Sequence, residues 1–298
     1  MPSLSKSLRD CIHDRDLILV TGKGGTGKST LVAALAELAH REKGRALAIE
    51  LSAHPRLPNI MGADTQVEMI NIDAEEVVGA ALGRLMKLPS VVASTLNNRI
   101  LRLFIRTAPA VKEMIALDEL QHLVEKRARK RCPVIVDLPA TGHAISLLEC
   151  PRSVRRMLRV GPLAGVAKRV EELLYDPKRC ELIVVALPEE LPINETIELV
   201  KRSEAIGVAC RVVVVNQVPR LSMLPEDRSL LDLLTEQNEG SIERFASSAR
   251  GEYDAAEDAR RQIERLKQET PVEVVELSQA LATEPWSCVE SAMQELTA

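Results

Sequence analysis

A glycine-rich stretch near the beginning of the chain has the composition and spacing of a phosphate-binding loop. Residues 22–30 read GKGGTGKST and fit the pattern G-x-x-x-x-G-K-[ST]. Glycines let the backbone bend until successive N–H groups point into one concavity, where a side chain would obstruct phosphates. Lys28 would hold the β- and γ-phosphates and Ser29 would supply an oxygen to Mg²⁺. We expect a nucleotide to contact Gly22, Lys23, Gly24, Gly25, Thr26, Gly27, Lys28, Ser29 and Thr30.

The segments on either side of this loop supply the context that the motif needs. Leu17–Thr21 has the composition of a buried parallel strand, and Leu31–Ala39 that of a helix. A helix start adds the positive end of a dipole, which attracts phosphate. The alternative, a chance match in a glycine-rich loop, does not explain these flanking patterns.

Phosphoryl transfer also needs an acid that positions the metal. The apolar run Pro133–Asp137 ends in such an acid, at the edge of the sheet where ligands bind. We expect Asp137 to act on Mg²⁺ through a water molecule. Gly142, a few residues later, would let the loop move with the γ-phosphate. The alternative role for Asp137 is to cap a helix at the end of a strand.

Apolar runs alternate with helical patterns along most of the chain. Several of the runs are continuous Val, Ile and Leu, which is typical of strands covered on both faces. We therefore predict an α/β fold with a doubly wound, mostly parallel sheet, forming a single P-loop domain over residues 1–298. The predicted strands are Leu17–Thr21, Arg45–Leu51, Val67–Ile72, Pro133–Leu138, Glu181–Leu187, Arg211–Asn216 and Val272–Leu277.

Residues 73–131 interrupt this alternation, because apolar residues recur there at helical spacing without a strand. Pro89 and Pro109 divide the stretch into about three helices. Together with residues 151–176 it predicts a helical subdomain, inserted on the ligand-facing edge of the sheet. The segment Glu252–Glu269 is charged on most faces, which predicts a solvated helix.

Composition narrows the class of partner. The net charge is −4 and aromatic residues make up 2% of the chain, which argues against nucleic acid. Six scattered cysteines form no C-x-x-C and fit a reducing compartment. The first residues do not resemble a secretory signal, and no apolar run approaches the ~20 residues of a membrane span. We expect a soluble, cytoplasmic protein, in which a basic stretch over 84–131 faces an acidic or membrane-surface partner or is simply solvated.

Three motifs together resemble one family, the arsenite-pump and tail-anchored-protein-targeting ATPases. Lys23 makes the loop K-G-G-T-G-K-[ST], residues 137–143 read DLPATGH against the family's D-T-A-P-T-G-H, and Val212–Gln217 contains its V-V-N-Q. The resemblance covers nearly the whole chain and implies a dimeric, Mg-ATP-dependent switch. It implies that Lys23 crosses to the partner's nucleotide, and that Asn216, followed by Gln217, reads adenine. The partner would be a second copy or a related ATPase, with a protein client or membrane-protein partner at the helical subdomain.

The first switch departs from the family. Residues 49–55 read IELSAHP, whereas the family has roughly D-P-A-H with an Asp that polarises the attacking water. Leu51 stands in the place of that Asp, and leucine cannot orient a water molecule. Glu50 precedes it, but neighbouring strand residues point to opposite faces. Three interpretations stay open: Glu50 takes the catalytic role, hydrolysis is slow, or the chain is a nucleotide-binding subunit beside a competent partner.

Other functions in this group find less support. The chain lacks the duplicated half and clustered cysteines of the arsenite pumps and the C-x-x-C of the zinc-clamped targeting factors. A partitioning ATPase would need a basic or amphipathic terminus, and an iron–sulfur reductase would depend on Cys150 alone. Apolar residues of the helical subdomain either line a client groove or pack its core: Leu85, Met86, Leu88, Val91, Val92, Ile100, Leu101, Leu103, Phe104, Ile105, Met114 and Met157.

Overall fold

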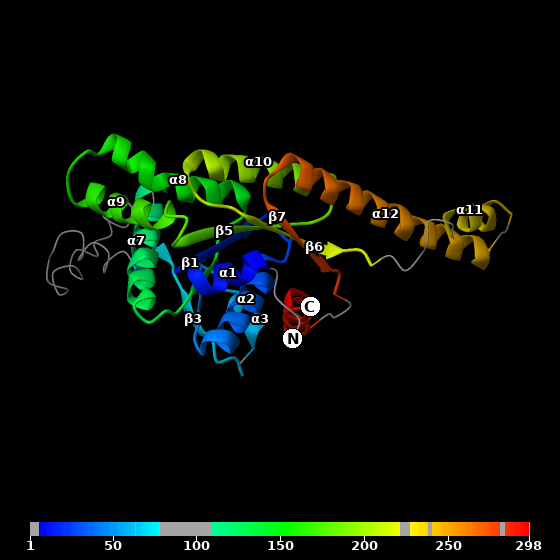
Figure 1. Cartoon of the computed structure of the whole chain (residues 1–298), viewed down its shortest axis with the longest axis horizontal. Coiled ribbons are helices and arrows are strands. Elements are labelled where there is room, and N and C mark those ends of the chain that lie inside the picture. Colours follow the sequence, from blue (N-terminus) through cyan, green and yellow to red (C-terminus); the bar gives the residue numbers. More distant parts are fainter. Residues whose placement is uncertain are drawn as a thin grey trace.

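Seven parallel strands form one sheet in the order β3-β2-β4-β1-β5-β6-β7 (Figure 1). This computed structural model describes residues 6–62, 64–74, 76–77, 109–220, 227–237, 240–280 and 284–297. Each predicted strand is confirmed, and so is the α/β class. The strands are β1 (Leu17–Gly22), β2 (Leu47–Glu50), β3 (Glu68–Asn71), β4 (Val134–Asp137), β5 (Cys180–Ala186), β6 (Val212–Val218) and β7 (Glu273–Ser278).

The strands in the middle of the sheet are covered on both faces. Every residue of β1, β2, β4 and β5 is buried, as their continuous apolar runs predict. Along β1, Leu17 and Leu19 pack into the core on one face, while Ile18 and Val20 pack into the core on the other. The outer strands β3 and β7 contain exposed residues because each has a neighbouring strand on only one side.

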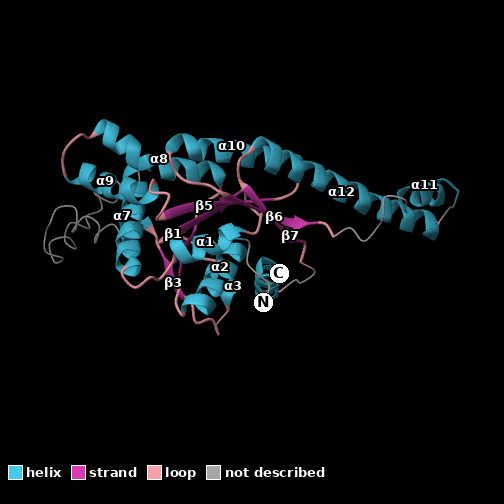
Figure 2. Ribbon diagram, in the orientation of Figure 1, coloured by secondary structure: helices cyan, strands magenta, loops and turns pink. Residues whose placement is uncertain are grey.

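Helices cover the two faces of the sheet in separate groups (Figure 2). One face packs against α1 (Lys6–Asp14), α2 (Lys28–Lys43), α3 (Leu57–Met61) and α13 (Pro285–Thr297). The other packs against α7 (Pro109–Ala128), α8 (Thr141–Met157), α9 (Pro162–Leu174), α10 (Glu190–Ile206) and α12 (Ser241–Glu269). Helix α11 (Asp227–Gln237) packs on the beginning of α12.

The helices α7, α8 and α9 contact one another at one end of the sheet (Figure 1). A helix begins at Pro109, as the sequence predicts. Pro89 and most of the proposed client groove lie outside the described residues, so the helical subdomain over 73–131 and 151–176 stays a prediction. Of the two groove methionines that are described, Met114 is buried in the core and Met157 is exposed.

The charged helix α12 differs from its prediction in length and in exposure. Helix α12 spans 29 residues from Ser241, so it begins well before Glu252. One stripe of it is buried, formed mainly by small alanines such as Ala246, Ala256 and Ala259, with Ile263 and Leu266 near its end. Alanines contribute little to a hydrophobic pattern, which is why the charged residues dominated the sequence interpretation.

Candidate functional site

The glycine-rich loop lies between β1 and α2 at the carboxyl end of the central strand. Two of its glycines are required by neighbouring strands. A Cβ on Gly22 would lie 2.1 Å from the carbonyl oxygen of Val185 in β5, and a Cβ on Gly27 would lie 2.3 Å from Nδ2 of Asn216 in β6. Gly27 also has a φ of 91°, in the left-handed region. The sequence interpretation attributed these glycines to space for phosphates, whereas here the chain's own strands exclude a side chain.

The two loop lysines are held in different ways. The Lys28 amine donates a hydrogen bond of 3.0 Å to the carbonyl oxygen of Lys23. Burial lowers the pKa of Lys28, while the charge of Asp137 acts in the opposite direction. A phosphate group would favour the charged amine further. The Lys23 amine forms an ion pair of 2.9 Å with Oε1 of Glu195 on α10, and both side chains are somewhat under half exposed.

Ser29 and Asp137 bring two side-chain oxygen atoms together beneath the loop. The Ser29 hydroxyl donates to Oδ2 of Asp137 over 2.5 Å. Asp137 is buried at the end of β4, and this burial raises the pKa of its carboxyl group. The Ser29 hydrogen bond lowers that pKa and the charge of Glu50 raises it. A hydroxyl and a buried carboxylate are oxygen ligands of the kind that Mg²⁺ uses, so these residues fit the ion.

Glu50 lies beside Asp137, since the two are register partners in β2 and β4. The Glu50 side chain nevertheless forms its hydrogen bonds with other groups. Oε2 accepts hydrogen bonds from the backbone N–H groups of Arg56, at 2.7 Å, and Leu57, at 3.0 Å. These two donors open helix α3, whose first N–H groups have no partner within the helix. The carboxylate therefore caps α3 and is buried there.

Leu51 packs on the opposite face of the sheet from Glu50, as strand geometry predicts. It is partly buried and lines a cavity of about 360 Å³ together with Ser52 and Ala53 of the first switch. Pro139 and His143 of the second switch line the same cavity. The two predicted switches thus meet here, and an apolar side chain faces the space between them.

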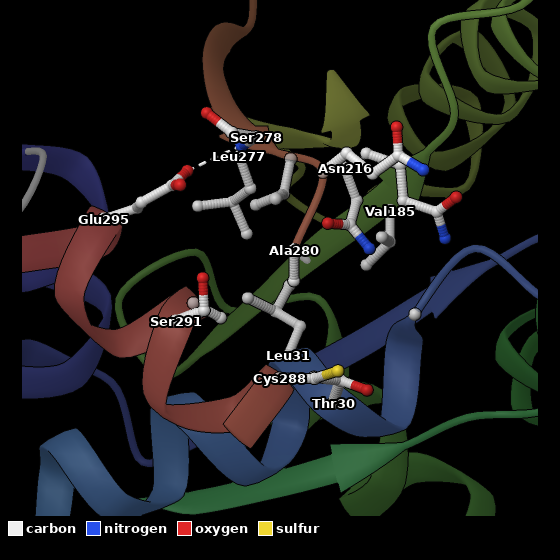
Figure 3. Close-up of a pocket in the computed structure, with 15 residues that line it drawn as sticks. Thr30, Leu31, Val185, Asn216, Leu277, Ser278, Ala280, Cys288, Ser291 and Glu295 are labelled. Carbon is white, nitrogen blue, oxygen red and sulfur yellow. Dashed lines mark hydrogen bonds between the residues drawn. The ribbon is translucent and has the colours of Figure 1, made fainter. Parts of the chain in front are cut away.

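A second cavity, of about 280 Å³, opens beside the start of α2 (Figure 3). Asn216 and Gln217 at the end of β6 line it with Gly27 and Thr30 of the loop. The Asn216 side chain donates a hydrogen bond of 2.9 Å to the carbonyl oxygen of Thr26 and so connects β6 to the loop. This amide retains its oxygen and a second N–H for a ligand. The cavity fits a base next to a phosphate loop.

The far wall of this cavity was not predicted from the sequence. It consists of the end of β7 with the residues that follow it and of helix α13 (Figure 3). Glu295 of α13 accepts a 2.6 Å hydrogen bond from the backbone of Ser278, which fastens the two parts of the wall together. The only signal in the sequence is the expected closing strand with its short terminal helix. The lining residues from this wall are Leu277, Ser278, Gln279, Ala280, Cys288, Ser291, Ala292 and Glu295.

The structure therefore brings most of the predicted site residues to one edge of the sheet. Lys23, Lys28, Ser29, Asp137 and Glu50 lie at the carboxyl ends of β1, β2 and β4 or in the loop after β1. Asn216 and Gln217 adjoin the same loop from β6. A parallel α/β sheet with a phosphate loop, a buried acid and an adjoining cavity is the arrangement of a nucleotide-binding protein.

Comparison with known proteins defines the family. The model of the family described as Anion-transporting ATPase matches residues 15–164 and 163–229. The chain belongs to this family, and the resemblance seen in its motifs is confirmed.

Curated relatives carry ATPase names. ATPase BagA of Mycobacterium tuberculosis is 28% identical over 232 residues, which cover 71% of this chain and 67% of BagA. The arsenical pump-driving ATPase of Escherichia coli is 26% identical over 219 residues, covering 70% of this chain and 36% of that protein. ATPase ASNA1 homolog 1 of Paramecium tetraurelia is 23% identical over 269 residues, which cover 74% of this chain and 80% of that protein.

Within the part of the chain that the structure describes, no helix is both long and apolar enough to span a bilayer.

Proposed function

We propose that the chain is a dimeric molecular switch that binds ATP and Mg²⁺ and hydrolyses ATP to drive a conformational change in a client or transport partner. The observation that carries this proposal is the 2.5 Å contact between Ser29 and Asp137 beneath the glycine loop. This contact supports a metal site beside the β- and γ-phosphates that Lys28 would hold. Magnesium would supply charge neutralisation at those phosphates.

The chain's own residues divide the work of binding. Backbone N–H groups of the loop and the start of α2 would bind phosphate oxygens, and the Lys28 amine would leave the carbonyl oxygen of Lys23 for the β- and γ-phosphates. Asn216 would present its free amide groups to adenine. The cavity beside it would receive the base, and Thr30 of the loop lines that cavity.

The second switch is built so that movement at the nucleotide reaches a helix. Strand β4 ends at Asp137, and α8 begins at Thr141, so only three residues separate the metal ligand from the helix. The Thr21 hydroxyl fixes this link, because it donates a hydrogen bond of 3.0 Å to the carbonyl oxygen of Pro139. A displacement of the link on γ-phosphate loss would therefore move α8 as a body.

Dimer formation would require Lys23 to exchange one partner for another. In the single chain Lys23 is paired with Glu195. An exposed ion pair contributes only about 0.2–1 kcal/mol, so a triphosphate on a second protomer would readily displace Glu195. The second protomer is a copy of this chain or a related ATPase.

A second candidate function is a non-hydrolysing subunit that uses ATP to lock a heterodimer. Two observations favour it. Leu51 presents an apolar side chain between the switches, and Glu50 is engaged in capping α3. Neither residue is placed to orient water, so hydrolysis would be slow or would depend on the partner.

The proposed client is a protein or a membrane-protein partner bound through the helices α7, α8 and α9 in the cytoplasm, and not a nucleic acid. We do not extend the proposal to arsenicals. Five of the six cysteines are buried. Among the described residues, no three His, Cys, Asp or Glu side chains form a group suited to a metal ion.

Phosphate release by the purified chain, compared with Lys28→Ala, tests the proposal. ATP binding and sedimentation with ATP and Mg²⁺ are measured on the same samples. We expect ATP binding, a shift to dimer and a release rate above that of Lys28→Ala. ATP binding and dimer formation with phosphate release no faster than that of Lys28→Ala would support the non-hydrolysing subunit. A chain that binds no adenine nucleotide would overturn both candidate functions.

A further inference from the structure

The turn between α8 and α9 exposes three apolar side chains within four residues. This elbow, residues 157–161, begins at the last residue of α8 and ends at Gly161, whose φ of 106° sets the direction of α9. Met157 is 79% exposed, Leu158 43% and Val160 86%. Single exposed apolar residues are ordinary, but three within four residues on an outward turn form a patch. The elbow lies on the outer side of the helices, away from the sheet (Figure 1).

Arginines surround this patch. Arg152, Arg155 and Arg156 line a surface cavity of about 430 Å³ with Glu171 and Tyr175. Two of the three arginines already have a partner: Arg155 forms an ion pair with Glu171, and the guanidinium carbon of Arg152 lies 4.9 Å from the centre of the Tyr175 ring. The cavity is nevertheless open to solvent and has more guanidinium groups than carboxylates.

Two guanidinium groups, that of Arg156 from the cavity and that of Arg159, lie next to the apolar side chains of the elbow. Arg156 at the end of α8 and Arg159 within the elbow are both exposed. Neither takes part in an ion pair with any of the described residues. The elbow therefore presents a net positive charge immediately beside an apolar tip.

We propose that the elbow binds the surface of an anionic phospholipid bilayer. Met157, Leu158 and Val160 enter the boundary between headgroups and acyl chains, and the surrounding arginines bind lipid phosphates. A side chain that inserts is best placed on a protruding turn with cations around it, and this is the arrangement at the elbow. An acidic protein segment would instead need a groove for its own apolar residues, whereas the elbow is a turn on the outer side of the helices (Figure 1). The proposal does not depend on ATP binding and goes beyond the switch function.

The α11–α12 arm provides an internal comparison. It also exposes apolar side chains, including Phe245 at 71% and Leu230 at 55%. Its charges are mixed, because Arg228, Arg244 and Arg250 lie among Asp227, Asp232 and Glu243, and Arg250 is paired with Asp232. The arm lacks the excess of cations found at the elbow, so apolar exposure at both places predicts binding to an anionic surface only at the elbow.

Flotation of the full chain with vesicles tests the proposal. Phosphatidylcholine vesicles with and without phosphatidylglycerol are used, at low and at physiological salt. We expect binding to the anionic vesicles only, and less of it as salt rises. A cationic side chain near an anionic surface strengthens binding about fivefold, so the double variant Arg156→Gln/Arg159→Gln lowers the partition coefficient about 30-fold. Met157→Ser/Val160→Ser lowers it about tenfold or more.

Matched variants on α12 serve as controls. Arg260→Gln removes an exposed arginine and Phe245→Ser an exposed apolar side chain, and both should bind vesicles like the parent. All substituted residues are exposed, and urea unfolding confirms that each variant is folded. Equal binding to both kinds of vesicle, or elbow variants that bind like the parent, would overturn the proposal. A chain that does not bind vesicles but binds polyglutamate would also overturn the proposal, because the elbow would then be a contact site for protein.

Discussion

The capping of α3 by Glu50 leads to a sharp prediction about which of its two candidate roles is real. Replacing Glu50 with alanine leaves the backbone donors of Arg56 and Leu57 without the acceptor that they use at 2.7 and 3.0 Å. Each buried donor that loses its partner costs about 1–3 kcal/mol. We therefore expect Glu50→Ala to lower the free energy of unfolding by roughly 2–6 kcal/mol.

The isosteric variant separates capping from catalysis. Glu50→Gln keeps an oxygen that can accept from the same donors, but it loses the charge that strengthens those bonds. It also loses the attraction between a carboxylate and a helix start, which is worth about 0.3–1 kcal/mol. Removing the charge beside Asp137 acts in the opposite direction, because that charge raises the pKa of Asp137. We expect a loss of about 1 kcal/mol in unfolding free energy and phosphate release within a few-fold of the parent.

The assay combines urea unfolding with steady-state phosphate release from the folded fraction. The control is Glu37→Gln, because Glu37 is also buried and accepts a hydrogen bond of 2.5 Å from Thr65, but on α2 away from Asp137. A catalytic Glu50 would behave differently. Glu50→Gln would then lower kcat by about 10²–10⁴ while the unfolding free energy stayed at the parent value. That result would refute the capping assignment.

Three further predictions concern the same edge of the sheet. Leu51→Asp restores a water-orienting carboxylate between the switches and should raise phosphate release by about tenfold or more; an unchanged rate would place the defect elsewhere. Glu195→Gln frees Lys23 and should strengthen ATP-dependent dimer formation up to about fivefold, measured by sedimentation, with no change if Lys23 never leaves its own chain. Burial raises the pKa of Asp137 above 3.8, so without metal its ionised form costs stability as pH rises through that raised value. Asp137→Asn should therefore stabilise the nucleotide-free chain at neutral pH in thermal unfolding and remove the effect of Mg²⁺ on ATP affinity.

Much of the fold follows from local pattern. The buried strands are runs of Val, Ile and Leu, and the phosphate loop carries its own flanking strand and helix, so both were predictable without tertiary information. Asn216, to which the family resemblance assigns the reading of adenine, lies beside the loop because parallel strands deliver their carboxyl ends to one edge.

The contacts that define the state of the site were not predictable in the same way. Lys23 and Glu195 are 172 positions apart in the chain, and their pairing depends on how α10 packs across the sheet. Glu50 accepts from backbone groups that follow it by six and seven residues, which requires the first-switch loop to fold back over its own strand. Side-chain identity cannot reveal an acceptor whose donors are main-chain atoms.

The division between Glu50 and Asp137 explains why a missing switch residue leaves the fold intact. The two carboxylates are neighbours on adjacent strands, and the charge of Glu50 raises the pKa of Asp137. Glu50 accepts hydrogen bonds from the backbone at the start of α3, and Asp137 accepts one from Ser29. Both carboxylates are therefore held in place without a ligand. Leu51 belongs to neither network and packs against the opposite core. Its identity can therefore change the rate of hydrolysis with little effect on the metal site, and this independence would let one scaffold serve as an active ATPase or as a nucleotide-locked subunit.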